Sequence, residues 1–235
     1  MKKLDLHPRI VLAVYAHPDD ADVAAGGALA AFAADGALVH IVTACDGAKG
    51  SGDPKVNIAE LRALRARELG LAAELLGAAS VESLGYADGD VSNDSHLRER
   101  LVAIIRRLRP EVVLGPDPTA TFFDGVYVNH RDHRELGWAL VDAVAPAAAM
   151  PLYFPDSGDM HHVDTLLLSG THEPDVIVDI SVGIEKKILA VLAHESQLSE
   201  DPEWVRNAVR ARAQQAGREV GIACGESFRH LDFSR

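Results

Sequence analysis

The sequence predicts a single-domain α/β fold of the Rossmann-like kind, with a mostly parallel sheet and helices on both of its faces. Short apolar runs alternate with longer amphipathic runs between residues 10 and 116. This alternation is typical of βαβ units, whose strands pair in parallel. A chain of 235 residues is long enough for one such domain with a substantial core. We therefore expect residues 1–235 to form one domain.

The first half of the chain supplies the clearest elements. The predicted strands cover residues 10–16, 37–45, 80–85 and 111–116, and the predicted helices cover residues 20–36, 58–77 and 96–110. Each of these helices ends at a residue that terminates helices, namely Gly36, Gly77 or Pro110. The intervening loops over 46–54 and 86–94 are rich in Gly and Asp, as turns usually are.

The second half is more mixed. A loop over residues 117–133 precedes a predicted helix over 134–148. Two short apolar segments follow at 165–170 and 175–181, and helices are predicted over about 182–195 and 202–216. The sequence contains no internal repeat and no low-complexity tract.

The bulk composition excludes several classes of function. The net charge is −12 and the sequence pI is about 5.3, which argues against partners such as nucleic acid or an anionic membrane surface. Asp5, His7 and Arg9 interrupt the first apolar run before it could serve as a signal peptide. Cys45 and Cys224 are too few for a disulfide framework and are expected to be buried thiols. We therefore expect a cytoplasmic protein.

A first polar motif, "HPDD", follows the first predicted strand and contributes His17, Asp19 and Asp20. Ligands of open α/β sheets bind at the carboxyl ends of the strands, where this motif lies. One aspartate at a helix start is explained by capping and by the helix dipole. Two aspartates beside a histidine repel each other unless a cation lies among them. The motif therefore indicates a metal site, with a charged helix start as the alternative.

A second motif, "NHRDH", spans residues 129–133 and opens a predicted helix after a loop. His130 and His133 are three residues apart, so both can lie on one face of a turn. Asp132 between them could hold a ring nitrogen by hydrogen bonding. Taken alone, this motif also fits a solvated, charged helix start.

The two motifs together indicate metal-assisted hydrolysis. Because both follow strands of one predicted sheet, we expect them in the same crevice. His17 and Asp20 with either His130 or His133 make a set of three ligands, which leaves an open position for water as in catalytic zinc sites. Asp19 and the remaining histidine would then be free for proton transfer and charge stabilisation.

With these motifs the chain resembles the PIG-L/LmbE family of zinc-dependent N-acetylglucosamine deacetylases. The specific part is the pairing of His-Pro-Asp-Asp with His-x-x-His, and weaker matches follow in the family's order over residues 16–27, 65–77, 84–89 and 175–197. The resemblance implies Zn²⁺ as the cofactor, with Fe²⁺ or another divalent metal as the alternative in the cell. It implies an N-acetylglucosamine-containing small molecule as the partner. Family members often form closed homo-oligomers, so the oligomeric state stays open.

The resemblance also implies a role for each matched residue. Three residues would bind the metal: His17, Asp20 and His133. Asp19 would act as the general base, and a protonated His130, tuned by Asp132, would stabilise the oxyanion. Arg65 and Asp88 would contact the substrate, although a solvated helix face is the alternative for Arg65.

The sequence departs from the family pattern at several positions. Ala21 and Asp22 stand where the family usually has Glu, and Asp22 keeps the charge. Arg131 replaces a proline of the second motif, where it could alter substrate preference. Val128 stands where some relatives have Tyr, and Tyr127 is one step away.

Other segments are candidates for the rim of the site. The loops over 46–54 and 117–129 are long enough to carry specificity, and Phe122, Phe123 and Tyr127 offer apolar faces to a sugar ring. The segment "AHESQ", with His194, would either line the crevice or cap a helix.

Three other functions compete with the deacetylase. A zinc amidase could cleave another N-acyl or thiol-conjugate substrate with the same site. A non-catalytic sugar-binding module would need neither the acid nor the base that the motifs supply. A nucleotide-binding Rossmann protein would carry G-x-G-x-x-G after the first strand, whereas "GGALA" at residues 26–30 does not match it.

Overall fold

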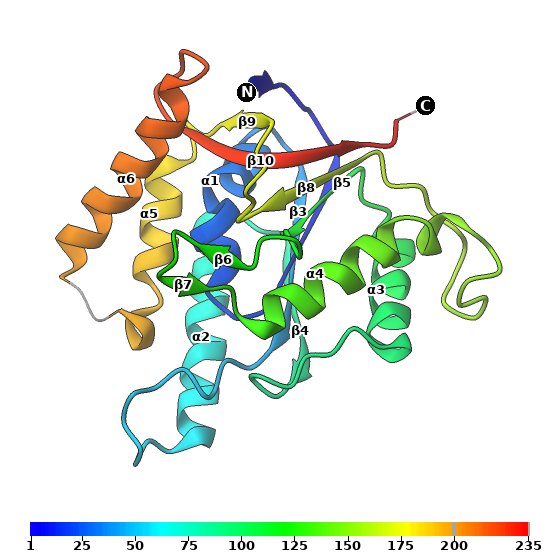
Figure 1. The fold of residues 1–235 in the computed structure, drawn as a ribbon, viewed down its shortest axis with the longest axis horizontal. Helices are drawn as coiled ribbons and strands as arrows, with labels where there is room; N and C mark the ends of the chain where they lie inside the picture. The colour runs from blue at the N-terminus through cyan, green and yellow to red at the C-terminus, as the bar shows by residue number, and fades with distance from the viewer. Residues whose placement is uncertain (199–200, 235) are drawn as a thin grey trace.

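The computed structural model describes residues 1–198 and 201–234, and its centre is an eight-stranded sheet (Figure 1). The strands lie in the order β1-β9-β10-β8-β5-β2-β3-β4. Their bounds are β1 Lys2–Leu4, β2 Ile10–Tyr15, β3 Leu38–Cys45, β4 Ser80–Tyr86, β5 Val112–Pro116, β8 Thr165–Ser169, β9 Val176–Asp179 and β10 Gly225–Asp232. All neighbours pair in parallel except β10, which is antiparallel to β8 and β9. The predicted mostly parallel α/β fold is confirmed.

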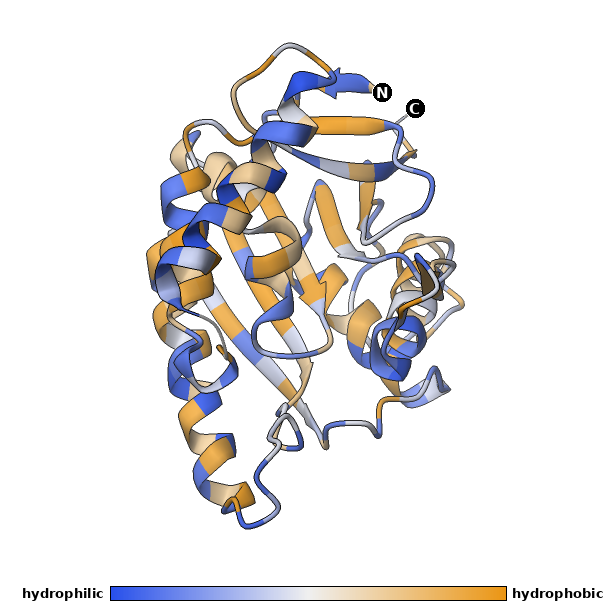
Figure 2. Ribbon diagram, turned by 60° about the vertical axis from the view of Figure 1, so that its left-hand side comes forward, coloured by the Kyte–Doolittle hydropathy of each residue, from blue (hydrophilic) through white to orange (hydrophobic). Residues whose placement is uncertain are grey.

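Helices cover both faces of this sheet. One face carries α1 (Asp20–Ala34), α2 (Ile58–Leu76) and α5 (Ile184–Leu192), with α6 (Pro202–Arg218) against α5 and β10. The other face carries α3 (Ser95–Leu108) and α4 (Arg131–Val144). Figure 2 shows the hydrophobic strands enclosed between these layers. In the part of the chain that the structure describes, every helix is too short or too polar to cross a bilayer.

Capping residues explain where the helices begin and end. The side chain of Asn57 accepts hydrogen bonds from the backbone N–H groups of Ala59 and Glu60, which starts α2. Gly77 ends α2 with φ of 84°, a conformation that glycine adopts without steric strain. Helix α3 ends before Pro110, as predicted, because proline has no N–H to continue the ladder.

The structure contains three features that the sequence analysis did not predict. Strands β1 and β10 both belong to the main sheet, and a small hairpin of β6 (Phe122–Phe123) and β7 (Tyr127–Val128) lies inside the predicted loop over 117–133. Strand β10 lacks an apolar pattern because Glu226 points into the protein and finds its partners there. Helix α4 starts at Arg131 and ends at Val144, so the predicted span of 134–148 was placed too late.

Helix α1 follows the central strand β2 and brings the first polar motif to the carboxyl edge of the sheet. Most of its residues are buried, because Ala and Gly let it pack between the sheet and α5. In the sheet, Ala13 of β2 pairs with Ile41 of β3 and Leu114 of β5. The turn after β2 is therefore flanked by strands on both sides.

Candidate active site

The first segment of the site is the turn between β2 and α1. Pro18 cannot extend the strand ladder because it has no backbone N–H, and the chain turns after His17. The backbone N–H of His17 donates to Asp20 Oδ2 at 2.7 Å. The same oxygen lies 3.2 Å from His17 Nδ1, so this turn places the carboxylate beside the ring.

The second segment is the start of α4. His133 lies in its first turn, and its Nδ1 is 2.8 Å from Oδ1 of Asn129. An amide oxygen only accepts, so Nδ1 carries the ring proton and Nε2 keeps its lone pair. The amide nitrogen of Asn129 donates to the carbonyl of Ala120 at 2.8 Å, which fixes the amide in this orientation. The lone pair of His133 therefore points toward the first segment.

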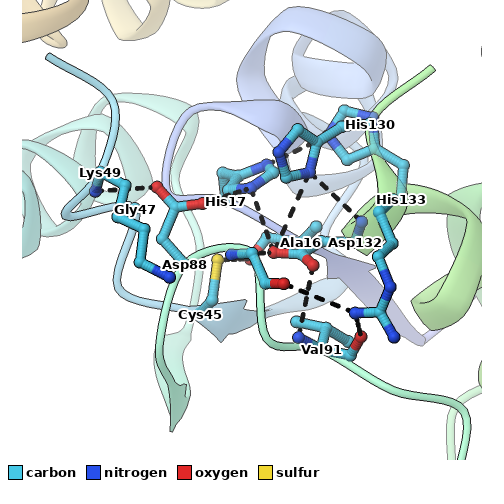
Figure 3. A network of polar contacts seen from close by, with 12 residues as sticks. Ala16, His17, Cys45, Gly47, Lys49, Asp88, Val91, His130, Asp132 and His133 are labelled. Carbon is cyan, nitrogen blue, oxygen red and sulfur yellow. Dashed lines mark hydrogen bonds and ion pairs between the residues drawn. The ribbon is translucent and has the colours of Figure 1, made fainter. Parts of the chain in front are cut away.

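Three donor atoms, from His17, Asp20 and His133, converge where the two segments meet, and Figure 3 shows the two histidines. Nε2 of His133 lies 3.1 Å from Nδ1 of His17 and 3.0 Å from Oδ2 of Asp20. With bonds of about 2.1 Å, the ligand atoms of a tetrahedral zinc lie about 3.4 Å apart. The three atoms thus match one face of a tetrahedral metal site, and we call them the ligand triangle.

The surroundings of the ligand triangle favour positive charge. Burial lowers the pKa of His17, but the carboxylates of Asp132, Asp20 and Asp88 outweigh burial and raise it. Burial raises the pKa of Asp20, but His133 and His17 outweigh burial and lower it. Two imidazoles and a carboxylate are donors that Zn²⁺ accepts, as do Fe²⁺ and Co²⁺. The donor set therefore fits a catalytic divalent metal.

A second group of side chains faces the other ring nitrogen of His17 (Figure 3). Nε2 of His17 lies 3.4 Å from Asp88 Oδ1 and 3.6 Å from Asp132 Oδ2, and Cys45 belongs to the same cluster. Asp132 also accepts the backbone N–H of Gly89 at 2.7 Å. Hydrogen bonding to His17 lowers the pKa of Asp88. Carboxylates placed behind a metal-binding histidine orient the ring, and we assign this role to the group.

This placement differs from two roles that the family resemblance implies. Asp88 was expected to contact the substrate, yet it is buried and its carboxylate faces His17. Asp132 was expected to tune His130, but its carboxylate lies 3.9 Å from His130 Nδ1. The bond to His130 comes instead from the backbone N–H of Asp132, at 3.2 Å.

Asp19, the expected base, is held by an arginine. Its side chain does not cap α1, and its Oδ1 accepts a hydrogen bond from Arg65 Nη2 at 2.9 Å. Arg65 is only 3% exposed, and its Nη1 donates to the carbonyl of Gly47 at 2.6 Å. Gly47 has φ of 62°, and a Cβ there would collide with Arg65. Arg65 is thus buried rather than solvated, and its charged partner is Asp19.

His130 lies beside the ligand triangle, with its ring centre 4.7 Å from that of His17 and 5.8 Å from that of His133. Its Nδ1 accepts the N–H of Asp132, so its proton is on Nε2. Burial and the charge of His17 lower the pKa of His130. In this arrangement the ring accepts at Nδ1 and offers one N–H at Nε2, whereas the family resemblance implies a protonated ring.

A cavity of about 600 Å³ is lined by two members of the ligand triangle, Asp20 and His133. Phe123 and Tyr127 of the hairpin also line its wall. Other wall residues come from α1, the ends of β2 and β8, α5 and α6: Val23, Tyr15, Ser169, Val191, Val209 and Arg212. Phe122 is 69% exposed and is not among the residues that line it. The volume of the cavity is typical of a site for a small molecule.

Asn129 was not predicted from the sequence as a residue of the site, and Arg131 makes a different contact from the one predicted. Asn129 stands four residues before His133, a spacing at which helical side chains meet, and this was the available signal. Arg131 was considered for substrate preference, but its guanidinium donates to the backbone carbonyl of Val91. Val128, on the hairpin, is exposed.

Comparison with known proteins identifies the family. A family model described as "PIG-L: GlcNAc-PI de-N-acetylase" matches residues 12–144, more than half of the chain and both segments of the site. The chain belongs to this family. Diacetylchitobiose deacetylase of Thermococcus kodakarensis is 34% identical over 194 residues, which cover 81% of this chain and 71% of that protein. The resemblance inferred from the motifs is confirmed.

Two solved structures agree with the fold. N,N'-diacetylchitobiose deacetylase from Pyrococcus horikoshii, complexed with an inhibitor, superposes with a TM-score of 0.86 at 30% identity, covering 96% of this chain and 84% of that one. GalB, the 4-carboxy-2-hydroxymuconate hydratase from Pseudomonas putida, superposes with a TM-score of 0.78 at 26% identity, covering 97% of both chains. The family and its deacetylase relatives make this chain a hydrolytic N-deacetylase.

Proposed function

We propose that this protein is a zinc-dependent deacetylase that hydrolyses the acetamide of an N-acetylglucosamine-containing small molecule, releasing acetate and a free amine. The observation that carries the proposal is the ligand triangle of His17, Asp20 and His133, with Asp19 in the same turn as Asp20 and held by Arg65. Its deacetylase relatives support the substrate class, since two are named for diacetylchitobiose. The cavity beside the triangle is large enough for a conjugated sugar.

A divalent cation bound by these residues would lower the pKa of a water molecule from about 15.7 to about 7 and polarise the amide carbonyl. Asp19 then accepts the proton of the attacking water. Arg65 engages Oδ1 of this carboxylate, which leaves Oδ2 to take the proton. Once protonated, Asp19 returns the proton to the departing amine nitrogen, so the general base becomes the general acid.

His130 stabilises the carbonyl oxygen as this oxygen gains negative charge. Its Nδ1 is engaged by the backbone of Asp132, so Nε2–H is free to donate. The donor is a neutral imidazole whose orientation is fixed before the substrate binds. Preorganised donors of this kind lower the activation barrier by about 3–4 kcal/mol in other acyl-transfer enzymes.

We further propose that residues 1–235 act as one catalytic domain and that it works in the cytoplasm. Strand β1 pairs with β9 and not with a separate unit, which supports a single domain. Cys45 and Cys224 are both buried free thiols, which suits a reducing compartment. The net charge of −12 supports a small-molecule partner over nucleic acid.

Acetate release from a panel of N-acetylglucosamine conjugates tests the function, with the zinc-loaded protein and its Asp19→Asn variant. The variant should bind one zinc per chain and lose about 10²–10⁴-fold in kcat, because the amide cannot accept the proton. Asp156→Asn, on an exposed loop, is the matched control and should retain full activity. Near-native turnover by Asp19→Asn would show that the base is another residue. A zinc-loaded wild type that releases no acetate from any conjugate would refute the function.

A hydratase is the second candidate, because the hydratase GalB shares this fold over 97% of both chains. Water addition to a conjugated acid also uses a base and an electrophilic centre. A conjugated dicarboxylic acid belongs in the same panel, followed by its absorbance. Loss of absorbance without acetate release from any conjugate would favour hydration.

A further inference from the structure

The segment His194–Gln197 follows α5 and takes no part in the chemistry proposed above. It contains the short helix η2 (Glu195–Gln197), and His194 precedes it as a buried residue, 1% exposed. His194 occupies the N-cap position of this helix, but its side chain makes no capping hydrogen bond and does not line the cavity. Its burial therefore needs another explanation.

His194 makes its contact with α1. Its Nε2 lies 2.7 Å from Oδ2 of Asp22, and both side chains are almost fully buried, at 2% and 1% exposed. Asp22 is three residues after Asp19, so it lies one turn further along the helix that begins at the site. His194 thus holds α1 close to the catalytic carboxylate.

Ser196 makes the equivalent contact with α2. Its backbone N–H donates to Glu68 Oε1 at 2.8 Å, and its hydroxyl donates to Glu68 Oε2 at 2.6 Å. Glu68 is 6% exposed and lies three residues after Arg65. In Figure 1, α5 ends beside α2, and η2 is in contact with α2. The same short segment therefore holds both helices.

The ion pair of Asp19 and Arg65 joins these same two helices one turn closer to the site. We propose that His194 and Ser196 are positioning residues, which fix α1 through Asp22 and α2 through Glu68 and thereby hold Asp19 in its catalytic orientation. The proposal rests on the proposed function, in which Asp19 is the base. We call His194, Ser196, Asp22 and Glu68 the helix clamp.

The chemistry of the helix clamp supports this role over simple packing. A buried carboxylate is unfavourable unless it is fully hydrogen-bonded, yet Asp22 Oδ1 and His194 Nδ1 have no partner among the described residues. An apolar pair of similar volume would fill the space without this penalty. The directional hydrogen bond between His194 and Asp22 instead fixes the orientation of α1. Orientation matters because a base displaced by about 1 Å can lose about 10²-fold in rate.

Steady-state kinetics of His194→Leu and His194→Gln test the helix clamp. His194→Leu removes the donor and should lower kcat by about tenfold or more, with KM within about twofold and one metal per chain. His194→Gln retains an N–H near the position of Nε2 and should stay within about threefold of wild type. His161→Leu is the matched control, because it removes a histidine hydrogen bond to the carbonyl of Pro110. Pro110 precedes β5, at the amino ends of the parallel strands and so opposite the site. A full-rate His194→Leu, or a Gln variant as slow as Leu, would overturn the proposal.

A double-mutant cycle asks whether the helix clamp acts through Asp19. In an Asp19→Asn background, His194→Leu should cause no further loss of kcat, because the group that it positions is already absent. An equal loss in both backgrounds would overturn the proposal and leave His194 with a general structural role.

A crystal structure gives a readout that does not need activity. In His194→Leu, or in the milder Ser196→Ala if the first variant does not fold, the contact of Asp19 Oδ1 with Arg65 Nη2 should lengthen or break. An unchanged contact of 2.9 Å would overturn the helix clamp. If the wild type released no acetate but the contact between Asp19 and Arg65 broke in the variant, the proposed function would be refuted and the helix clamp would stand.

Discussion

In the proposed metal site, Asn129 holds the proton of the far nitrogen of His133 and so leaves the lone pair of Nε2 free for a metal. We predict that Asn129→Ala weakens zinc binding about 10–100-fold, because the ring loses both its fixed tautomer and its orientation. Competition with a chelating dye measures this dissociation constant. Asn207→Ala, on the exposed face of α6, should leave it unchanged. Equal zinc affinity in the Asn129 variant and wild type would show that the amide is dispensable.

His130 should be neutral in the working enzyme. Burial and nearby positive charge lower its pKa below the usual 6.5, and a metal held by His17 acts in the same direction. The charged form therefore predominates only at pH values below 6.5. Carbon-13 NMR of the ring, assigned with His130→Gln, should give a titration midpoint below 6.5. A midpoint above 6.5 would restore the imidazolium as the oxyanion donor.

At the scale of residues, short motifs predicted the donor atoms of the site but not their partners. His17, Asp20 and His133 could be chosen because two motifs at strand ends carried metal-binding residue types. The contact between Asp19 and Arg65 joins residues 46 positions apart, and no local pattern links them. The tautomer of His130 depends on a backbone N–H, which every residue except proline supplies.

At the scale of elements, a buried ion pair fixes the middle of α1. Lys187 of α5 lies 2.5 Å from Glu226 of β10, and Lys187 also donates to the carbonyl of Val23. Glu226 accepts the backbone N–H groups of Gly27 and Ala28. A Cβ at Gly27 would lie 2.5 Å from Ile180, so glycine is required for this close approach. Side chains of two other elements thus bond to the backbone of α1.

We predict that Lys187→Met lowers the free energy of unfolding by about 3–5 kcal/mol, because it leaves Glu226 buried without a cation. Urea denaturation measures this change. Lys186→Met alters the exposed neighbour of Lys187 and should change stability by less than about 0.5 kcal/mol. The double variant Lys187→Met with Glu226→Gln should be more stable than Lys187→Met alone. A double variant that is less stable would contradict the account.

Elements with strong local signals could be predicted, and those stabilised by distant partners could not. The boundaries of α2 were predicted within one residue, because an apolar periodic run ends at Gly77. Strand β10 was missed because its sequence has no alternation, and its pairing with β8 and β9 depends on residues 46 to 67 positions away. Helix α4 was placed three residues late because its cap is His130, an unusual capping residue.

At the scale of the whole molecule, metal binding should be visible as stability. Free zinc at about 100 times its dissociation constant stabilises the folded state by about 2.7 kcal/mol, or roughly 5–10 °C in Tm for a chain of this size. Thermal denaturation with zinc and with a chelator measures the difference. His17→Ala should abolish it, and His40→Ala, near the start of β3, should not. An equal response in both variants would mean that zinc binds elsewhere.

The order of the strands has a consequence for how the chain is made. Strand β1 pairs with β9, so Lys2 has no partner in the sheet until Val176 has been synthesised. Both β1 and β9 reach the rest of the sheet only through β10, whose residues emerge from the ribosome later still. Until then the nascent chain carries two unpaired sheet edges, which can template aggregation. Slow folding and dependence on chaperones during synthesis are the expected results, and pulse proteolysis of stalled nascent chains would reveal when the sheet closes.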